Sequence, residues 1–308
     1  MRNDFVKQMQ IEMENNKDIV FLTGDLGFNA LEPLHQSFPD RFINVGIAEA
    51  NMIGIAAGLA LTGKKVIVYS IASFLTMRPY EQIRNDICYH NLDVKIVGTG
   101  GGFNYSTHGI THHTIEDVAI MNVLPNMQVL CPTYSWEARE ATKSMMKSKK
   151  PTYLRLGKSP KTNFFKPDFK FKIGRGFVIR EGKDILLLVT GNILDCGMEI
   201  AEIIKNKTGL EMSVISMPSV KPLDKKLILE TSKKVKLVAT LEEHSLHGGL
   251  GSEVAMLLSQ SHLPKLPFIP SALPDVFIKD VGSRDFLLNK AGLSPKKVAK
   301  NIIKKLGR

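Results

Sequence analysis

Cysteine is scarce in this chain of 308 residues, which contains only Cys88, Cys131 and Cys196. Three widely spaced thiols exclude a disulfide-stapled scaffold and a cysteine-based zinc site, and they are typical of a protein from a reducing cytoplasm. We therefore expect a cytoplasmic protein in which Cys131 and Cys196 are core residues.

Long hydrophobic runs are also missing. The longest apolar stretches, such as Ile185–Val189, are far too short to span a bilayer. The first residues, Met1-Arg2-Asn3-Asp4, lead into a polar helical pattern and not into the apolar core of a signal peptide. The sequence therefore predicts no contact with a membrane.

Acidic residues are too few to balance the basic ones, which leaves a net charge of +11. The excess lies in scattered lysines and in a basic end from Lys296 to Arg308. Aromatic residues do not interleave with these lysines, so we predict no nucleic-acid partner. A solvated lysine-rich surface is the favoured interpretation, and attraction of anionic substrates or an acidic partner is the alternative.

The segments that are present alternate between strand-like and helix-like patterns. Buried strands separated by helices are typical of a parallel sheet with both faces covered, so the sequence predicts an α/β fold. The expected strands are Asp18–Thr23, Lys65–Ile71, Val94–Thr99, Met127–Cys131, Asp184–Thr190, Glu211–Ser216 and Val235–Glu242. The expected helices are Ala48–Leu61, Pro79–Cys88, Ile115–Val123, Ser135–Ser148, Ile193–Lys207 and Ser252–Ser259.

A break in this alternation divides the chain. Residues 159–172 contain two prolines and several lysines but no apolar periodicity. We expect two doubly wound α/β domains, at residues 1–160 and 173–308, with a linker at 161–172.

The most informative segment is Phe42–Ala60, a strand, a turn and a helix of small and apolar residues. Gly54 and Gly58 lie four apart on one helical face, which suggests close approach of a neighbouring element. Glu49 is the one acidic residue of this helix. It is either a first-turn glutamate that complements the helix dipole or a buried carboxylate with a chemical role.

Several motifs along nearly the whole chain resemble one enzyme family. The sequence is similar to the pyrimidine-binding and C-terminal domains of transketolase in its split, two-chain form. It also resembles deoxyxylulose-phosphate synthase and the β subunit of 2-oxoacid dehydrogenases. The motifs are Phe38-Pro39-Asp40-Arg41-Phe42, Val45-Gly46-Ile47-Ala48-Glu49, Ala56-Ala57-Gly58-Leu59-Ala60, Ser73-Phe74-Leu75 with Tyr80-Glu81-Gln82-Ile83-Arg84, Gly109-Ile110-Thr111-His112, and Glu242-Glu243-His244 with Gly248-Gly249-Leu250-Gly251.

The resemblance implies that the cofactor is thiamine diphosphate and that Glu49 is catalytic. In the family this glutamate hydrogen-bonds N1′ of the aminopyrimidine and favours the imino tautomer that activates the cofactor. Phe74 is expected to follow the strand Val66–Ile71 in a loop and to stack on the pyrimidine. Ile47 and Arg78 are further expected cofactor contacts. Asp25 is either a cofactor contact or a turn aspartate.

A histidine cluster runs from His108 to His113. Thr114 resembles a helix N-cap, which makes a helical zinc pair of His108 and His112 improbable in geometry. The resemblance places His112 near the substrate, where it can serve as an acid, base or hydrogen-bond donor. We expect a catalytic His112 and no metal ligands in this chain.

Three positions depart from the usual family pattern. His108 replaces an aspartate that contacts a substrate hydroxyl, and Gly100 falls where many relatives carry a histidine. Lys158 stands where relatives tend to use arginine to hold a phosphate, so the charge is kept but the bidentate fork is lost. We expect all three positions to line the substrate site and to favour a non-standard ketose.

The diphosphate half of the cofactor site is missing from the sequence. The family binds the diphosphate through magnesium with Gly-Asp-Gly and later asparagines, whereas Gly24-Asp25-Leu26 lacks the second glycine. The resemblance therefore implies a partner subunit that carries Gly-Asp-Gly and Asn-Asn and binds most of the Mg²⁺ (or Ca²⁺). It also implies self-association and an α2β2 heterotetramer.

The leading hypothesis is transfer of a two-carbon ketol unit between sugars by a two-chain transketolase. The first alternative is the β subunit of a 2-oxoacid dehydrogenase E1 component. A non-catalytic structural or regulatory subunit is the alternative from another class. Glu242, Glu243 and His244 are expected to shape the C-terminal domain and its interface.

Overall fold

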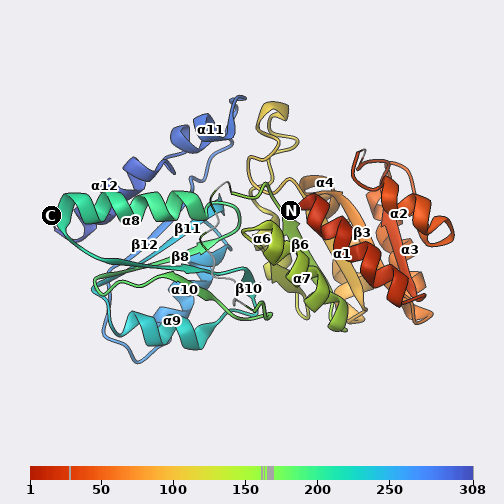
Figure 1. Cartoon of the computed structure of the whole chain (residues 1–308), viewed down its shortest axis with the longest axis horizontal. Coiled ribbons are helices and arrows are strands. Elements are labelled where there is room, and N and C mark those ends of the chain that lie inside the picture. Colours follow the sequence, from red (N-terminus) through yellow and green to blue (C-terminus); the bar gives the residue numbers. More distant parts are fainter. Residues whose placement is uncertain (28, 161, 163, 165–169, 308) are drawn as a thin grey trace.

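The computed structural model describes residues 1–27, 29–160, 162, 164 and 170–307. The first half of the chain, drawn in red to green, forms one α/β unit on the right of Figure 1. The second half, drawn in green to blue, forms another on the left, with the C-terminus at its far end. Part of the expected linker, at residues 161, 163 and 165–169, lies outside the described residues.

The first sheet contains seven strands in the order β10-β5-β6-β4-β3-β1-β2. The strands from β5 to β2 pair in parallel, as the sequence predicts. Their bounds are β1 (Ile19–Thr23), β2 (Phe42–Asn44), β3 (Lys65–Ile71), β4 (Val94–Thr99), β5 (Gln128–Leu130) and β6 (Thr152–Leu156).

Alternate residues of the central strands enter two different cores. Phe21 and Ile67 pack with α1 and α7 on one face, which Figure 1 shows side by side in front of the sheet. Leu22 and Val68 pack with α3 and α6 on the other face. Burial on both faces explains why these strands are continuous apolar runs. The helices are α1 (Arg2–Asn15), α2 (Glu32–Ser37), α3 (Glu49–Leu61), α4 (Ala72–Met77), α5 (Tyr80–Gln82), α6 (Asp117–Asn122) and α7 (Ser135–Lys147), with the short helices η1 (Pro39–Arg41), π-helical η2 (Ile83–Tyr89) and η3 (Ser106–His108).

The second sheet has five strands in the order β12-β11-β8-β9-β7. One core lies between it and α8 with α12, and another lies under α9 and α10. The strands are β7 (Phe177–Arg180), β8 (Ile185–Thr190), β9 (Met212–Ser216), β11 (Leu237–Ser245) and β12 (Phe268–Leu273). The helices are α8 (Leu194–Thr208), α9 (Lys225–Ser232), α10 (Leu250–Ser259), α11 (Arg284–Lys290) and α12 (Pro295–Lys305).

The expectation of purely parallel sheets is wrong at two edges. β7 pairs with β9 in the antiparallel sense. β10 (Ser219–Lys221) follows β9 in the chain, yet it pairs antiparallel with β5 of the first sheet. Both are short edge strands, for which no long crossover connection is needed. The α/β class with two sheets is confirmed, and β10 joins the two units through backbone hydrogen bonds.

The exposed side of α3 differs from what the sequence suggested. A Cβ placed at Gly54 or at Gly58 would meet no other described atom within 4 Å. Leu61 and Ile47, at the two ends of this helix, are also exposed. No described element of this chain therefore approaches the two glycines, and the helix presents a flat face of small residues to the outside.

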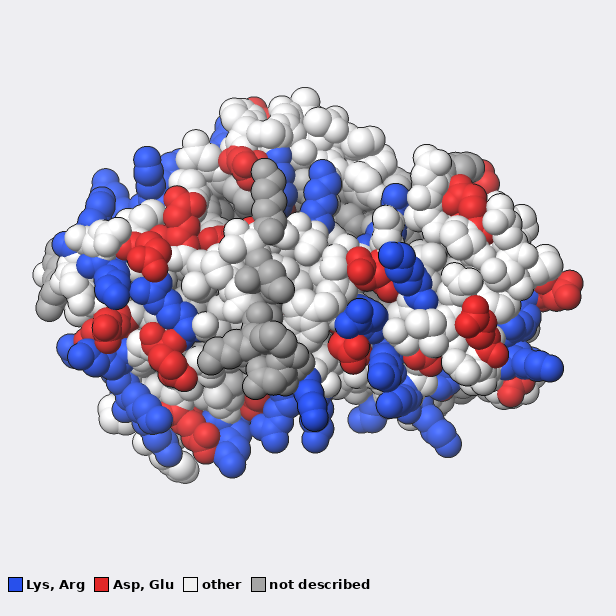
Figure 2. Space-filling model, viewed as in Figure 1, with Lys and Arg blue, Asp and Glu red and all other residues white. Residues whose placement is uncertain are grey.

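Basic residues are spread over the surface, where Figure 2 shows them interspersed with acidic ones. One group of lysines gathers around a hollow between the end of α8 and α12, formed by Lys207, Lys296, Lys297, Lys300 and Lys304. Within the described ranges, every helix is too short or too polar to cross a lipid bilayer.

Candidate active site

The candidate residues gather along one edge of the first sheet. Phe74 and Gly100 follow β3 and β4, while Asp25 and Lys158 follow β1 and β6. These strands are neighbours and run in parallel, so their carboxyl ends meet at the same edge. Ligands of open α/β sheets bind at that edge.

Glu49 is the first residue of α3 and is only 3% exposed. Its Oε2 accepts a hydrogen bond from Arg78 Nη1 at 3.0 Å, which is also an ion pair. Its Oε1 accepts one from the hydroxyl of Ser70, on β3, at 3.3 Å. The carboxylate therefore lies at the positive end of a helix and is buried, so both sequence-based interpretations describe part of its environment.

Arg78 connects Glu49 to the aromatic residues of the site. Its guanidinium carbon lies 4.0 Å from the ring centroid of Phe74, which is a cation–π contact. Phe74 meets His112 edge-on, with ring centroids 5.0 Å apart, and the centroids of His112 and His108 are 4.9 Å apart. The structure thus brings Glu49, Arg78, Phe74, His112 and His108 into one continuous cluster.

Phe74 does not lie in a loop, contrary to the sequence-based expectation. α4 begins at Ala72, directly after β3, because the backbone turns from extended at Ile71 into the helix without a connecting loop. The hydroxyl of Ser73 donates a hydrogen bond to the Thr111 carbonyl at 3.0 Å. α4 therefore holds both the aromatic ring and the histidine-bearing segment.

The N-cap assigned to Thr114 is also wrong. α6 begins at Asp117, and the hydroxyl of Thr114 bonds to the His112 carbonyl instead. Thr114 forms an isolated antiparallel bridge with Gly102, which ties the histidine segment to the loop after β4. The extended pairing at Thr114 delays the start of the helix by three residues.

His112 is only partly exposed. Desolvation lowers its pKa from the ordinary value, and the neighbouring His108 and Arg78 lower it further. Thr111 Oγ1 lies 2.9 Å from His112 Nδ1. At neutral pH the imidazole is therefore neutral, with one nitrogen able to accept a proton and the other able to donate a hydrogen bond.

Asp25 and Ile47 lie at the rim of the cluster. Asp25 is exposed, has a φ of 55° and exchanges two hydrogen bonds of 2.9 Å with Asn44. These contacts are those of a turn aspartate. Ile47, two residues before Glu49, is 75% exposed, which is unusual for so large an apolar side chain.

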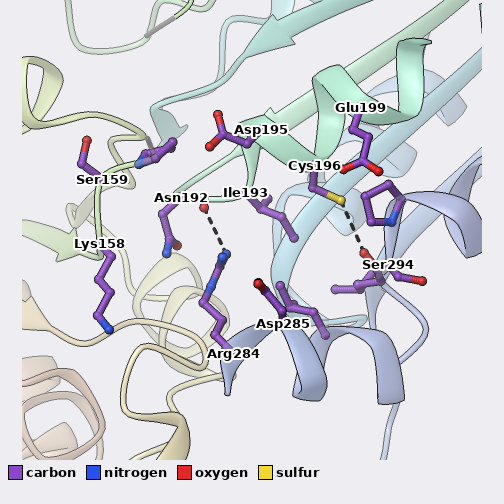
Figure 3. A pocket seen from close by; sticks show the side chains of 14 residues that line it. Lys158, Ser159, Asn192, Ile193, Asp195, Cys196, Glu199, Arg284, Asp285 and Ser294 are labelled. Carbon is purple, nitrogen blue, oxygen red and sulfur yellow. Dashed lines mark hydrogen bonds between the residues drawn. The ribbon is translucent and has the colours of Figure 1, made fainter. Parts of the chain in front are cut away.

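Gly100 and Lys158 line a shared cavity of about 630 Å³ together with Tyr105. Lys158 also borders a second cavity, of about 480 Å³, between the two halves of the chain. Figure 3 shows Arg284 of α11 reaching toward Asn192, whose carbonyl accepts its hydrogen bond at 3.0 Å, with Lys158 on the segment after β6. The backbone N–H of Lys158 donates to Asn104 at 2.9 Å, so the segment is fixed while the ammonium group is exposed.

A buried ion pair supports the histidine segment from below. Arg155 Nε donates to Asp117 Oδ2 at 2.8 Å, and Tyr153 donates to the same oxygen at 2.6 Å. Arg155 Nη2 also donates to the carbonyls of Thr114, at 2.8 Å, and of Glu243, at 3.1 Å. Breaking such a buried pair costs about 3–5 kcal/mol. The pair therefore anchors the histidine segment to the C-terminal unit.

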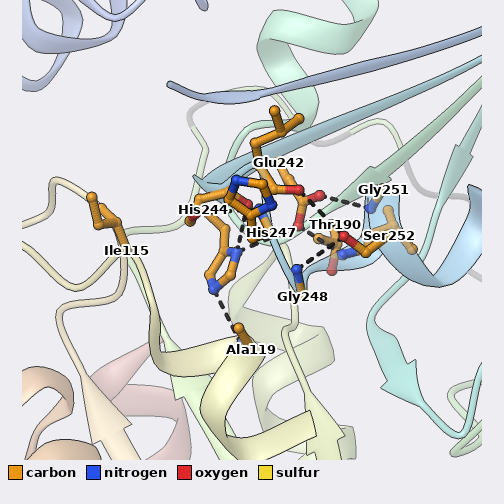
Figure 4. A network of polar contacts seen from close by, with 12 residues as sticks. Ile115, Ala119, Thr190, Glu242, His244, His247, Gly248, Gly251 and Ser252 are labelled. Carbon is orange, nitrogen blue, oxygen red and sulfur yellow. Dashed lines mark hydrogen bonds and ion pairs between the residues drawn. The ribbon is translucent and has the colours of Figure 1, made fainter. Parts of the chain in front are cut away.

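The end of β11 adds further contacts between the two units. Glu243 accepts a hydrogen bond from the backbone of Phe103 and pairs with Arg284. His244 Nε2 accepts one from the backbone N–H of Ala119 in α6 at 3.2 Å, while Glu242 caps the start of α10 (Figure 4). Desolvation raises the pKa of Glu242 to about 7. As the sequence suggested for Glu242, Glu243 and His244, these contacts are structural.

His244 makes the stability of the protein sensitive to acid. Burial lowers its pKa from 6.5 to about 4, although Asp117 partly opposes this effect. The folded state therefore binds this proton less readily than the unfolded chain, so the contribution is fully present above pH 6.5 and is lost as the pH falls toward 4. Over that range we expect a loss of about 3 kcal/mol in unfolding free energy from this group.

The variant His244→Asn tests this expectation, because asparagine retains an acceptor for the Ala119 N–H but does not titrate. Unfolding free energy is measured by urea denaturation for both proteins at pH 4.5, 5.5, 6.5 and 7.5. The difference between them should be constant above pH 6.5 and should shift in favour of the variant below it. Glu242 and Glu137 titrate in both proteins and cancel. Parallel curves down to pH 4.5 would contradict the assignment.

Two contacts of the site were missed from the sequence. Ser70 lies within a buried strand and has no motif around it. Tyr105 follows the glycine run and gives no signal by itself, although the absence of a side chain at Gly100 leaves room that another residue must fill. In the described part of the chain, no three His, Cys, Asp or Glu side chains lie together as a metal site.

Comparison with protein-family models identifies two matches. The transketolase pyrimidine-binding domain matches residues 1–161, and the transketolase C-terminal domain matches residues 174–298. One of the two subunits of an apulose-4-phosphate transketolase from Actinobacillus succinogenes is 34% identical over 86% of this chain and 85% of its own length. A 6-deoxy-6-sulfo-D-fructose transketolase subunit from Clostridium sp. is 33% identical over 97% and 92%.

Solved structures give the same result for the fold. A structure described as a split-gene transketolase, inactive beta4 tetramer, is 37% identical, with a TM-score of 0.88 over 99% of this chain and 97% of that one. Transketolase from Campylobacter jejuni has a TM-score of 0.78 at 18% identity, which speaks for the fold alone. This chain covers 46% of that longer protein.

Proposed function

We propose that this chain, which belongs to the transketolase family, is the C-terminal-half subunit of a two-chain enzyme that transfers a two-carbon ketol unit with thiamine diphosphate. The observation that carries the proposal is the buried carboxylate of Glu49 within a cluster of Arg78, Phe74 and His112. The division into domains at 1–160 and 173–308, with a linker at 161–172, is part of the proposal and agrees with the matched ranges.

The residues fit an aminopyrimidine. A planar group that lies over Phe74 and hydrogen-bonds Glu49 is already accommodated here, because the Arg78 guanidinium does both. Glu49 would hold a proton between its carboxylate and N1′, and Phe74 and Ile47 would supply apolar contact. Arg78 would border the ring, and Asp25 would lie at the rim. Bound thiamine diphosphate supplies the carbanion and the electron sink for the transfer.

The histidines would handle the hydroxyl protons of the substrate. A neutral His112 can accept a proton from a sugar hydroxyl and return it, and His108, whose ring lies against it, can hydrogen-bond the sugar. Lys158 would attract an anionic group of the substrate, beside the space at Gly100. Sugars that carry a phosphate or a sulfonate are named for two relatives, and we propose an anionic ketose as the substrate class here.

The partner would be an N-terminal-half subunit that carries Gly-Asp-Gly and Asn-Asn. It would bind the diphosphate and most of the Mg²⁺ (or Ca²⁺), because this sequence has no such motif. The flat face of α3 at Gly54 and Gly58 supports self-association, and the 37% identical relative is itself described as a tetramer. We propose an α2β2 heterotetramer in the cytoplasm.

The proposal is tested by identifying the products of the reconstituted complex. An anionic ketose and an aldose acceptor labelled with ¹³C are incubated with both subunits, thiamine diphosphate and Mg²⁺, and products are identified by mass spectrometry. We expect a donor shortened by two carbons and an acceptor extended by two. Oxidative decarboxylation of a 2-oxoacid, with no ketose turnover, would instead favour the dehydrogenase β subunit. No turnover of any kind would favour a non-catalytic subunit.

A further inference from the structure

Tyr105 fills the space beside Gly100. Gly100 has a φ of 90°, and a Cβ built on it would overlap the Cδ2 and Cε2 atoms of the Tyr105 ring. A side chain at position 100 and the observed placement of Tyr105 therefore exclude each other. Because Gly100 directly follows β4, Tyr105 occupies a position at the carboxyl end of a central strand, where α/β sheets bind their ligands.

The ring of Tyr105 also joins the histidine cluster. It meets His108 edge-on, with ring centroids 5.6 Å apart at 74°, and His112 at 5.9 Å and 77°. Such edge-to-face contacts are favourable and directional, so the three rings orient one another. His112 in turn contacts Phe74, which leaves Tyr105 separated by a single imidazole ring from the residue expected to contact the cofactor.

Tyr105 is half-buried and lines the same cavity of about 630 Å³ as Gly100 and Lys158. Lys158 is exposed, and its ammonium group has no ion-pair partner among the residues that the structure describes. The cavity therefore offers a phenol that can both donate and accept a hydrogen bond, together with a cation available for an anion. This combination suits a hydroxylated chain that ends in a phosphate or a sulfonate.

We propose that Tyr105 is a specificity-determining substrate contact, which bounds the sugar pocket at the place where position 100 contributes no side chain. This inference rests on the proposed function, because it assigns Tyr105 to the substrate of that reaction. The ring of Tyr105 sets the width of the pocket beside the two histidines, and its hydroxyl hydrogen-bonds a hydroxyl of the ketose on the side toward Lys158.

The steric part of the inference is tested without any activity measurement. Gly100→Ala, Tyr105→Ala and the double variant are compared by thermal unfolding of this chain. Gly100→Ala is expected to lower the midpoint by several degrees, through overlap with Tyr105 and the strain of a positive φ. The double variant should recover the part due to overlap, so that the two changes are not additive. Additive shifts would overturn the mutual exclusion of the two side chains.

The functional part uses the reconstituted two-subunit enzyme with two probe donors, D-fructose 6-phosphate and 6-deoxy-6-sulfo-D-fructose, and one acceptor. Tyr105→Phe removes only the hydroxyl and is expected to lower kcat/KM about tenfold for the preferred donor. Tyr105→Ala, which widens the pocket, should change the ratio of the two kcat/KM values by at least about fivefold. The dissociation constant of thiamine diphosphate should stay the same in both variants.

Tyr89→Phe is the matched control, since Tyr89 is 82% exposed on η2, and all its constants should be unchanged. Equal losses for both donors in Tyr105→Ala, with no effect of Tyr105→Phe, would reduce Tyr105 to a structural residue and overturn this inference alone. Absence of two-carbon transfer from both donors by the unaltered enzyme would overturn the proposed function, and this inference with it.

Discussion

Replacing Glu49 by alanine is expected to lower two-carbon transfer by the reconstituted enzyme about 10³-fold, because proton transfer by a positioned side chain contributes about 10²–10⁴ to the rate of an enzyme. The carboxylate is 3% exposed, and its two oxygens contact Ser70 and Arg78. No other carboxylate is available to take its place at the start of α3, where Glu49 is the one acidic residue. Initial rates at saturating donor, acceptor and cofactor measure the effect.

Two further variants separate chemistry from folding. Glu49→Gln keeps the size of the side chain but removes the charge, so it should be nearly as inactive while it unfolds at a similar temperature. Glu81→Gln is the matched control, because Glu81 is an exposed glutamate of the neighbouring helix α5. Its rate should stay within about twofold of the unaltered enzyme, as expected for a surface position. More than a tenth of the original rate in Glu49→Ala would refute the catalytic assignment.

The isolated chain is expected to transfer no measurable ketol unit, even with excess thiamine diphosphate and Mg²⁺. Its residues provide a pocket for the pyrimidine, but the sequence has no Gly-Asp-Gly motif to bind the diphosphate through magnesium. The cofactor would lose its charged contacts, and the loss of charge-assisted hydrogen bonds at about 1.5–3 kcal/mol each weakens binding by at least about 100-fold. The dissociation constant is measured by calorimetry with and without the partner.

Titration of this chain with the N-terminal-half subunit should restore the rate and saturate at equal amounts of the two chains. Light scattering should then show a complex with two copies of each. The partner on its own serves as the control and should be inactive, because it would lack Glu49 and the histidines. Turnover by this chain without its partner would refute the split-site arrangement, even if Glu49 remained essential.

Much of the first sheet could be predicted from the sequence. β3 and β4 have the bounds that their apolar runs suggest, and β1 differs by one residue. Strands buried on both faces must be apolar at every position, and this requirement leaves a clear local signal. The edge strands β7 and β10 were not predicted, because their few residues carry no such pattern and their pairing partners are distant in the chain.

The same division holds for the candidate site. Glu49, Phe74, Arg78 and His112 were named from motifs, whereas their arrangement as one connected cluster follows from the parallel order of β1, β3 and β4. The start of α6 could not be predicted, because Thr114 pairs with Gly102 across the sheet edge and this contact is not local. Tyr105 was missed for the same reason.

Residue types and short spacings were enough to establish the α/β class, the family resemblance and the presence of a carboxylate and histidines suited to the reaction. A single chain displays such properties directly, because each of them depends on neighbouring positions. Three features became visible only in the folded chain: Tyr105 fills the space at Gly100, β10 crosses to the first sheet, and Arg155 and His244 hold the histidine segment. These contacts join distant segments, and they exist only once both sheets have packed.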